Sequence, residues 1–147
     1  LPWATSTTRS LSAPRSFTDS PSGNYANNAS TSLVSPLLNA SGFAQTELRF
    51  ASWCDTEANR DFGRVDLSVD GGASYSQIWS CSGRPTWEEV RIALPTAAQQ
   101  AQVRVRFRFT ADSSVNRDGW YVDNVELIGG SLSCPFTQDI IFDDGFQ

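Results

Sequence analysis

The chain has 147 residues, eleven of them basic and sixteen acidic, and its formal net charge at pH 7 is −5. This length is typical of one domain. All eleven basic residues are arginines, which excludes histidine-dependent triads, histidine-bound zinc, serine–lysine dyads and phosphate-loop lysines. The acidic balance argues against nucleic acid or an anionic membrane as a partner. No apolar run is long enough to span a bilayer, and the first residues do not resemble a signal peptide, so we expect a mature product or a piece of a longer protein.

Short apolar runs separated by Gly, Pro, Ser, Asn and Asp clusters predict β-strands along most of the chain. In chain order, the predicted strands are residues 31–38, 46–53, 64–70, 75–80, 87–94, 102–109 and 119–128. The strongest is 102–109, where valine and phenylalanine alternate with arginine. Only residues 95–102 favour a helix, of one or two turns. The pattern predicts an all-β antiparallel sandwich of jelly-roll or related topology.

One hairpin is predicted closely, at residues 68–75. The sequence Asp70-Gly71-Gly72 joins two alternating runs, and adjacent glycines supply the positive φ that tight hairpin turns need. The segment also matches the Asp-box pattern of sialidase propellers, in which Ser and Asp tie the turn together and are not catalytic. A propeller would need a copy in several blades. A single copy indicates a folding device.

Cysteine usage favours an exported protein. Cys54 and Cys81 flank the hairpin, in positions that could meet across paired strands, and a disulfide there requires an oxidising compartment. Cys134 is then left over. The three cysteines allow three single pairings, and the sequence does not choose among them.

Two stretches carry a family resemblance: the hairpin segment Asp61–Gly72 and "DGWYVDNV", residues 118–125. In their linear order they resemble the MAM-like, jelly-roll (galactose-binding-like) β-sandwich domains appended to secreted bacterial peptidases and other exoproteins. The likeness covers residues 3–128. This chain has Tyr75 where most relatives have Trp, and Asn124 where they usually have a second Asp. The resemblance implies a secreted, calcium-stabilised, non-catalytic module, with the parent peptidase domain or its macromolecular substrate as partner.

The predicted strand 119–128 carries Asp123 in its middle. A buried aspartate without a partner costs several kcal/mol, and calcium takes six to eight oxygen ligands from distant segments. In related jelly-roll modules the last-strand Asp faces a loop near the N-terminus across a metal ion. The resemblance therefore implies a calcium site formed by Asp123 with Asp19 and Asn24. The alternative is an Asp123 that pairs with an arginine or points into solvent.

A second acidic cluster contains Asp55, Glu57 and Asp61. Its spacing misses the calcium-binding EF-hand loop. It holds a second ion, lines a ligand groove, or forms a solvated loop. Asp112 and Asp118 bracket another loop with the same alternatives.

Two groups of residues are candidates for a macromolecular ligand. Arg104, Arg106 and Arg108 form a stripe that suits carboxylates, or that pairs across strands with acidic neighbours, namely Glu47, Glu88, Glu126 or Asp66. Tyr75 and Trp79, near the hairpin, are the aromatic side chains that we expect at the surface, where they would stack on sugars. These features make a module that binds polysaccharide or cell-wall polymer the alternative function.

The composition changes after residue 130, so we expect a sandwich domain at 1–130 and a tail at 131–147. The tail is predicted to add an edge strand around "IIF", residues 140–142, that covers unpaired hydrogen bonds. The alternative is a sorting or processing signal, because the tail resembles the C-terminal ends of some secreted bacterial proteins.

Overall fold

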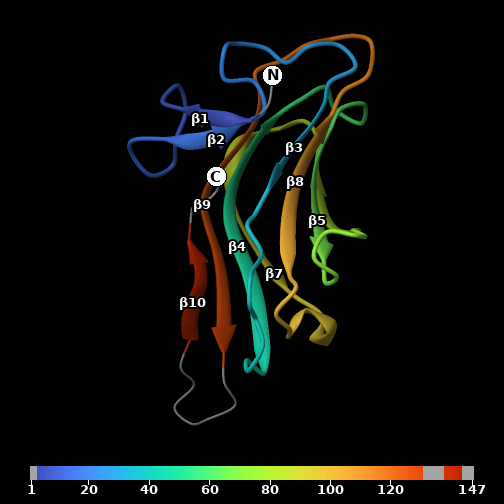
Figure 1. Ribbon diagram of the computed structural model, residues 1–147. Coiled ribbons are helices and arrows are strands. Elements are labelled where there is room, and N and C mark those ends of the chain that lie inside the picture. The colour runs from blue at the N-terminus through green and yellow to red at the C-terminus, as the bar shows by residue number, and fades with distance from the viewer. Residues whose placement is uncertain (1–2, 131–137, 144–147) are drawn as a thin grey trace.

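The structure, a computed structural model, describes residues 3–130 and the backbone of residues 138–143, and its strands form two antiparallel sheets packed face to face (Figure 1). Sheet 1 has the order β1 (Ala4–Ser6), β2 (Ser16–Thr18), β9 (Gly119–Gly130), β4 (Gln45–Asp55) and β7 (Arg84–Ala93), and β10 (Gln138–Asp143) also pairs with β9. Sheet 2 has the order β3 (Ser30–Val34), β8 (Arg104–Thr110), β5 (Phe62–Ser68) and β6 (Ser76–Cys81). A single 3-10 turn, η1 (Thr96–Ala98), connects β7 to β8. The predicted all-β jelly-roll sandwich is confirmed.

Each predicted strand overlaps an observed one, but its bounds differ at one or both ends. The first predicted run is too long, because β3 ends at Val34, before Pro36, and Leu38 forms only an isolated bridge with Val103. The sequence reading missed β1 and β2, which are three residues long and show no alternation that could be recognised. Within the part of the chain that the structure describes, no helix has the length and apolar character of a membrane span.

The Asp-box hairpin is tied by its own side chains. Ser68 Oγ accepts a hydrogen bond from the N–H of Gly72 at 2.8 Å, and Asp70 Oδ1 accepts one from the N–H of Ser74 at 2.9 Å. Hydrogen bonds from the hydroxyl and the N–H of Ser74, and from the Ser68 hydroxyl, lower the pKa of the Asp70 carboxyl to about 2. Both glycines of the turn have positive φ, 74° and 99°. These contacts stabilise the turn, which is the role that the sequence analysis predicted for a single Asp box.

The core lies between the two sheets and centres on Trp120 of β9. The ring of Trp120 stacks with Trp79 at a centroid distance of 6.1 Å and meets Trp3 edge-on at 5.4 Å. Its Nε1–H donates to Ser52 Oγ at 3.0 Å, so the buried indole nitrogen is satisfied. Gly63 of β5 is needed here, because a Cβ at this position would lie 2.5 Å from the Trp120 ring.

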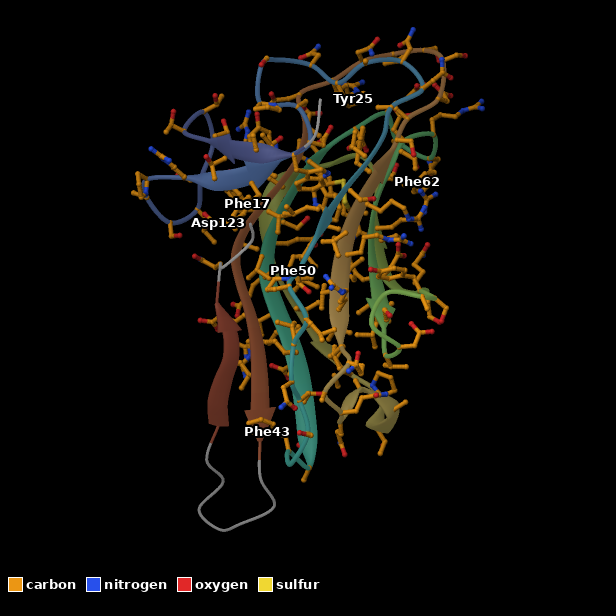
Figure 2. The ribbon with its side chains drawn as sticks, in the orientation of Figure 1. Phe17, Tyr25, Phe43, Phe50, Phe62 and Asp123 are labelled. Carbon is orange, nitrogen blue, oxygen red and sulfur yellow. A yellow bond between two sulfur atoms is a disulfide. The ribbon has the colours of Figure 1, made fainter. Side chains whose placement is uncertain are left out.

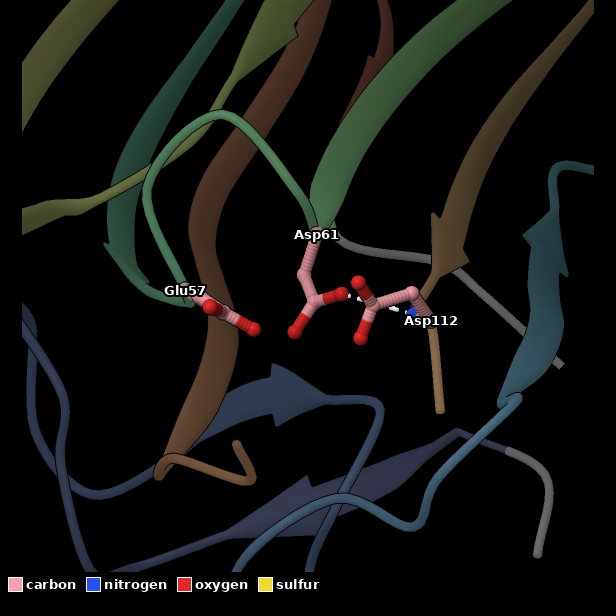
Figure 3. Close-up of side chains that lie close together, drawn as sticks. All are labelled: Glu57, Asp61 and Asp112. Atoms are coloured by element: carbon pink, nitrogen blue, oxygen red, sulfur yellow. Dashed lines mark hydrogen bonds between the residues drawn. The ribbon is translucent and has the colours of Figure 1, made fainter. Parts of the chain in front are cut away.

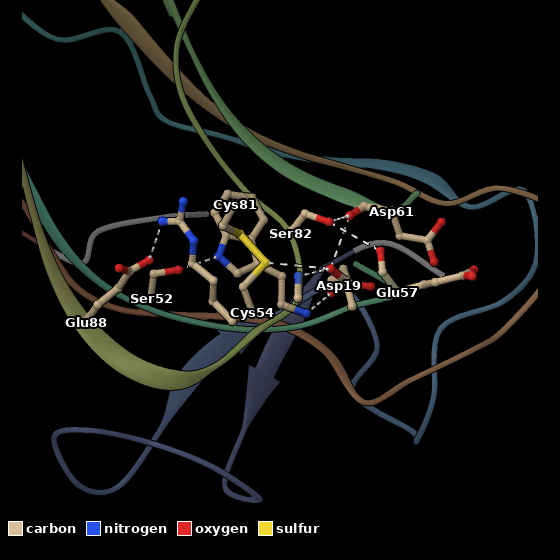
Figure 4. The surroundings of a disulfide bond; sticks show 12 residues. Asp19, Ser52, Cys54, Glu57, Asp61, Cys81, Ser82 and Glu88 are labelled. Carbon is tan, nitrogen blue, oxygen red and sulfur yellow. Dashed lines mark hydrogen bonds and ion pairs between the residues drawn. A yellow bond between two sulfur atoms is a disulfide. The ribbon is translucent and has the colours of Figure 1, made fainter. Parts of the chain in front are cut away.

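A disulfide joins Cys54 and Cys81 (Figure 4). It lies near Trp120, which the strand register places opposite Cys54. Cys54 lies near the end of β4 in sheet 1, and Cys81 ends β6 in sheet 2. The expected pairing is therefore present, but it links the two sheets and not two paired strands. Cys134 lies outside the described residues.

Candidate functional site

Three acidic side chains meet at one end of the sandwich. Glu57 lies in the β4–β5 connection, Asp61 directly precedes β5, and Asp112 follows β8. Their carboxylates point toward one another (Figure 3), and one ligand oxygen from each lies within 4.8 Å of the others. The fold explains the meeting, because β5 and β8 are antiparallel neighbours with Phe62 opposite Thr110. The residue before β5 and the segment after β8 therefore lie at the same end of sheet 2.

Asp61 is the centre of this cluster and is fully buried. Its Oδ2 accepts a hydrogen bond from the Tyr25 hydroxyl at 2.6 Å, and its Oδ1 accepts one from the N–H of Asp112 at 2.7 Å. The Tyr25 oxygen in turn accepts the N–H of Glu57 at 3.0 Å. Burial, and then the hydrogen bond to Asp61, raise the pKa of Tyr25 well above its usual value. The neutral Tyr25 phenol therefore donates to the Asp61 carboxylate. It anchors the N-terminal loop, residues 19–29 between β2 and β3, to the cluster.

The cluster has the donor set of a hard cation. Glu57 Oε2 is a buried atom without a hydrogen-bond partner among the described residues, which is costly for a carboxylate oxygen. Calcium–oxygen distances of about 2.3–2.6 Å put two ligands of one ion at most about 5 Å apart, so an ion can touch all three carboxylates. Oxygen ligands without His or Cys favour calcium or magnesium over zinc. The residues present therefore fit a metal ion.

The residues predicted for the main calcium site have separate partners. Asp19 Oδ1 accepts the N–H of Trp120 at 2.7 Å, whereas Asn24 Nδ2 donates to the carbonyl of Asn116 at 3.2 Å. Asp123 lies three residues beyond Trp120 on β9, which is about 10 Å along a strand. An ion shared by these residues stays a prediction. Of the second predicted cluster, Glu57 and Asp61 meet, and Asp112 takes the place that was expected for Asp55.

Asp123 is held by backbone amides, a partner that the sequence reading did not consider. It is 2% exposed, and its Oδ2 accepts the N–H groups of Leu11 and Ser12, both at 2.8 Å. Its Oδ1 accepts the Ser12 hydroxyl at 3.1 Å and the N–H of Asn124 at 2.8 Å. Figure 2 shows Asp123 beside the segment between β1 and β2. The mid-strand carboxylate therefore fastens this segment to the outer face of sheet 1.

We expect Asp123→Ala to lower the free energy of unfolding by about 2 kcal/mol, because three backbone N–H groups, those of Leu11, Ser12 and Asn124, lose a charged acceptor. The loss should be equal with calcium and with EDTA, as measured by urea unfolding. Glu126→Ala, which removes a half-buried carboxylate on the same strand, is the matched control and should cost less than about 0.5 kcal/mol. A loss seen only in the presence of calcium would instead make Asp123 a metal ligand.

The predicted arginine stripe lies on the outer face of sheet 2. Arg106 and Arg108 both form ion pairs with Asp66 Oδ2 at 2.8 Å, and Arg104 donates to the carbonyls of Gly71 and Ser35. Asp66 is 1% exposed. Burial opposes its ionisation, but the hydrogen bonds and charges of the two arginines outweigh burial and lower the pKa of Asp66. Of the predicted pairings, the structure shows the one with Asp66.

The two predicted surface aromatics differ. Trp79 is partly buried; it packs edge-on against Phe50 at 5.2 Å and stacks on Trp120, and its role in binding sugars stays a prediction. Tyr75 lies under the Arg106 guanidinium, 3.9 Å from the ring centroid.

The outer face of sheet 1 carries an aromatic pair that the sequence analysis missed. The half-exposed rings of Trp53 and Trp87 lie there with their centroids 6.0 Å apart. That face also has a groove of about 320 Å³ with Ala51 in its floor and Leu11 at its rim.

The fold and these surfaces define a class, the jelly-roll β-sandwich modules. The chain belongs to the Reelin subrepeat B family, which residues 26–129 match. It is 33% identical over 106 residues to Bacillopeptidase F of Bacillus subtilis (strain 168), an alignment that covers 71% of this chain and 7% of that protein. The predicted resemblance to sandwich domains of bacterial peptidases is confirmed.

Solved structures share the fold at low sequence identity. The K2 cleaved adhesin domain of Lys-gingipain has a TM-score of 0.58 and 12% identity, with 84% of this chain and 81% of that chain covered. The carbohydrate-binding module CBM27-1 of Caldicellulosiruptor saccharolyticus, solved with mannohexaose, has a TM-score of 0.54 and 12% identity, with 84% and 80% covered.

Proposed function

We propose that this chain is a calcium-stabilised, non-catalytic accessory domain of a secreted bacterial peptidase. The observation that carries the proposal is the carboxylate cluster of the buried Asp61 and the partly buried Glu57 and Asp112, with its unpartnered Glu57 oxygen. Calcium there would fasten the β4–β5 connection, the segment after β8 and, through Tyr25, the N-terminal loop. The likeness to Bacillopeptidase F supports a peptidase as the parent protein, and the disulfide supports an oxidising, extracellular compartment.

Calcium in excess should raise the melting temperature of the domain relative to EDTA. A ligand at a hundred times its dissociation constant adds about 2.7 kcal/mol, which for this size is a rise of roughly 5–10 °C. Glu57→Gln and Asp112→Asn, which keep the side-chain shape and remove one charge each, should abolish the rise in a thermal melt followed by circular dichroism.

Asp55→Asn is the matched control, since it removes a carboxylate from the end of β4 and leaves the cluster intact. It should keep the full calcium response. A response that survives Glu57→Gln but is lost in Asp19→Asn would move the ion to the site predicted from the resemblance. No response in the wild type would exclude calcium from the proposal. The peptidase parent is checked separately, by reading the complete gene for an adjoining catalytic domain.

A module that binds polysaccharide is the second candidate function. The observation that favours it is the outer face of sheet 2, where arginines lie on aromatic rings: Arg106 over Tyr75 at 3.9 Å, and Arg64 over Phe62 at 4.6 Å. Aromatic rings and planar polar groups are the side chains that sugars contact best. The two functions are compatible, because an accessory domain can carry a peptidase to a polymer surface.

A further inference from the structure

The charges of this protein are divided between its two sheets. The strands of sheet 2 contain four arginines and one acidic residue, whereas β1, β2, β4, β7 and β9 contain three arginines and six acidic residues. The whole chain has a net charge of −5. Sheet 2 therefore presents a cationic face on an acidic protein, and such a face attracts anionic ligands while the rest of the surface repels them.

The arginines of sheet 2 form one patch, which we call the arginine face: Arg64, Arg104, Arg106 and Arg108 around Asp66. The pairing of β5 with β8 places Arg64 opposite Arg108 and Asp66 opposite Arg106. Asp66 neutralises one charge for the two arginines that it binds. Arg104 is held by backbone carbonyls, and Arg64 donates to the Thr110 hydroxyl. The face therefore keeps an excess of positive charge.

This excess of positive charge destabilises the domain when no ligand is bound. Side chains directly opposite on neighbouring strands have Cβ atoms about 5 Å apart, where like charges destabilise the sheet. Burial, and then the nearby charge of Arg108, lower the pKa of Arg64. An anion between Arg64 and Arg108 removes this repulsion. The patch is thus organised for a ligand more than for the stability of the fold.

The surroundings of the patch match a sugar polymer. Stacking on Phe62 and Tyr75 holds two guanidinium groups flat, and Figure 2 shows Phe62 on β5 beside this face. The rim has small hydroxyl and amide side chains that can hydrogen-bond sugar hydroxyls: the strand register places Ser32 opposite Arg108, Ser80 opposite Arg64 and Gln77 opposite Asp66. A peptide that binds by adding a strand needs a sheet edge, whereas this patch lies on the face of the strands.

We propose that the outer face of sheet 2 binds a carboxylate-bearing polysaccharide, such as a uronic acid polymer, through Arg64, Arg106 and Arg108. Each guanidinium offers a planar fork that takes a carboxylate in a bidentate way. This inference rests on the polysaccharide-binding function proposed above, and it adds the site and the chemical class of the ligand.

The test is isothermal titration of the whole chain with polygalacturonate, with neutral galactan and with poly-glutamate, at low and at physiological salt. Arg64→Gln should weaken binding of polygalacturonate by about tenfold, the cost of losing one charge-assisted hydrogen bond. The double variant Arg64→Gln/Arg106→Gln should lose about a hundredfold, while Arg108 still neutralises Asp66. Binding should weaken as salt rises.

Two controls locate the site. Arg91→Gln removes the same charge from β7 in sheet 1, where Arg91 is exposed and pairs with Glu89, and it should bind like the wild type. Trp87→Ala alters the half-exposed tryptophan pair on the outer face of sheet 1 and should also leave binding unchanged. Unchanged melting temperatures in all variants show that any loss of binding is not a loss of folding.

The other outcomes overturn the inference in distinguishable ways. Equal binding of galactan, lost in Trp87→Ala, would place a neutral glycan on sheet 1 and leave polysaccharide binding standing. Equal binding of poly-glutamate would show an unspecific anion site or a peptide partner. No binding of any polymer would remove both this inference and the second candidate function, and the calcium response of the accessory domain would still be tested by its own melting curves.

Discussion

Reduction of the Cys54–Cys81 disulfide lowers the free energy of unfolding by about 3.5 kcal/mol, the loop-closure entropy that a bridge of this span removes from the unfolded chain. The two cysteines are 27 residues apart in the sequence. The loop contains β5, the Asp-box hairpin and β6, so the bridge restricts most of one half of sheet 2. Urea unfolding of the oxidised and the reduced protein, both with Cys134→Ala to prevent mispairing, measures the difference.

The variant Cys54→Ala/Cys81→Ala separates the covalent link from packing. Both sulfurs are buried, and Cys81 Sγ lies against Gly63 in the core, so the double variant loses contacts in addition to the link. We expect it to be about 1 kcal/mol less stable than the reduced protein. A reduced protein within about 1 kcal/mol of the oxidised one would contradict the prediction. In that case packing around Trp120 alone would hold the two sheets together.

The strands were predictable because each has a local pattern. The alternation of residues 102–109 and the turn at Asp70–Gly72 need no information beyond a few neighbouring residues, and both are found where expected. The segments β1 and β2 carry no such pattern. They become strands because Phe17 and Thr18 pair with β9 at the far end of the sequence, and a single sequence contains no signal of that pairing.

The candidate metal cluster was half predictable for the same reason. Glu57 and Asp61 are neighbours in sequence, but Asp112 joins them only because β5 and β8 pair. The sequence held a usable signal, since Asp112 lies two residues after β8, the strand with the clearest alternation, and Asp61 directly precedes β5. Pairing these two strands antiparallel would have predicted the meeting. The amide partners of Asp123 had no such signal, because any loop can present two N–H groups.

A second large effect is expected for Asp19, whose burial raises its pKa to about 7. The carboxyl is 6% exposed, and the approach of Gly119 closes the space around it, because a Cβ there would lie 2.8 Å from Oδ1. The hydrogen bond from the N–H of Trp120 acts in the opposite direction and favours the charged form. The folded state therefore keeps a proton that the unfolded state releases near pH 4.

The stability of the protein should consequently fall as the pH rises from about 4 to 7 and level off above that, with a drop of about 3 kcal/mol between pH 4.5 and 8. The sign follows from proton counting, since in this window the folded state binds more protons than the unfolded state. The lowered pKa of Asp66 acts below this window, where acidification removes stability. Urea unfolding in EDTA at several pH values measures the curve.

Asp19→Asn isolates this carboxyl, because asparagine keeps the acceptor for the Trp120 N–H and does not ionise. The variant should match the wild type near pH 4.5 and be about 3 kcal/mol more stable at pH 8. Repeating the series with calcium then separates the two metal sites. If calcium binds at Glu57, Asp61 and Asp112, the advantage of the variant at pH 8 persists, because Asp19 still carries a buried and uncompensated charge. If Asp19 is a ligand, calcium stabilises its ionised form, and the advantage disappears or reverses.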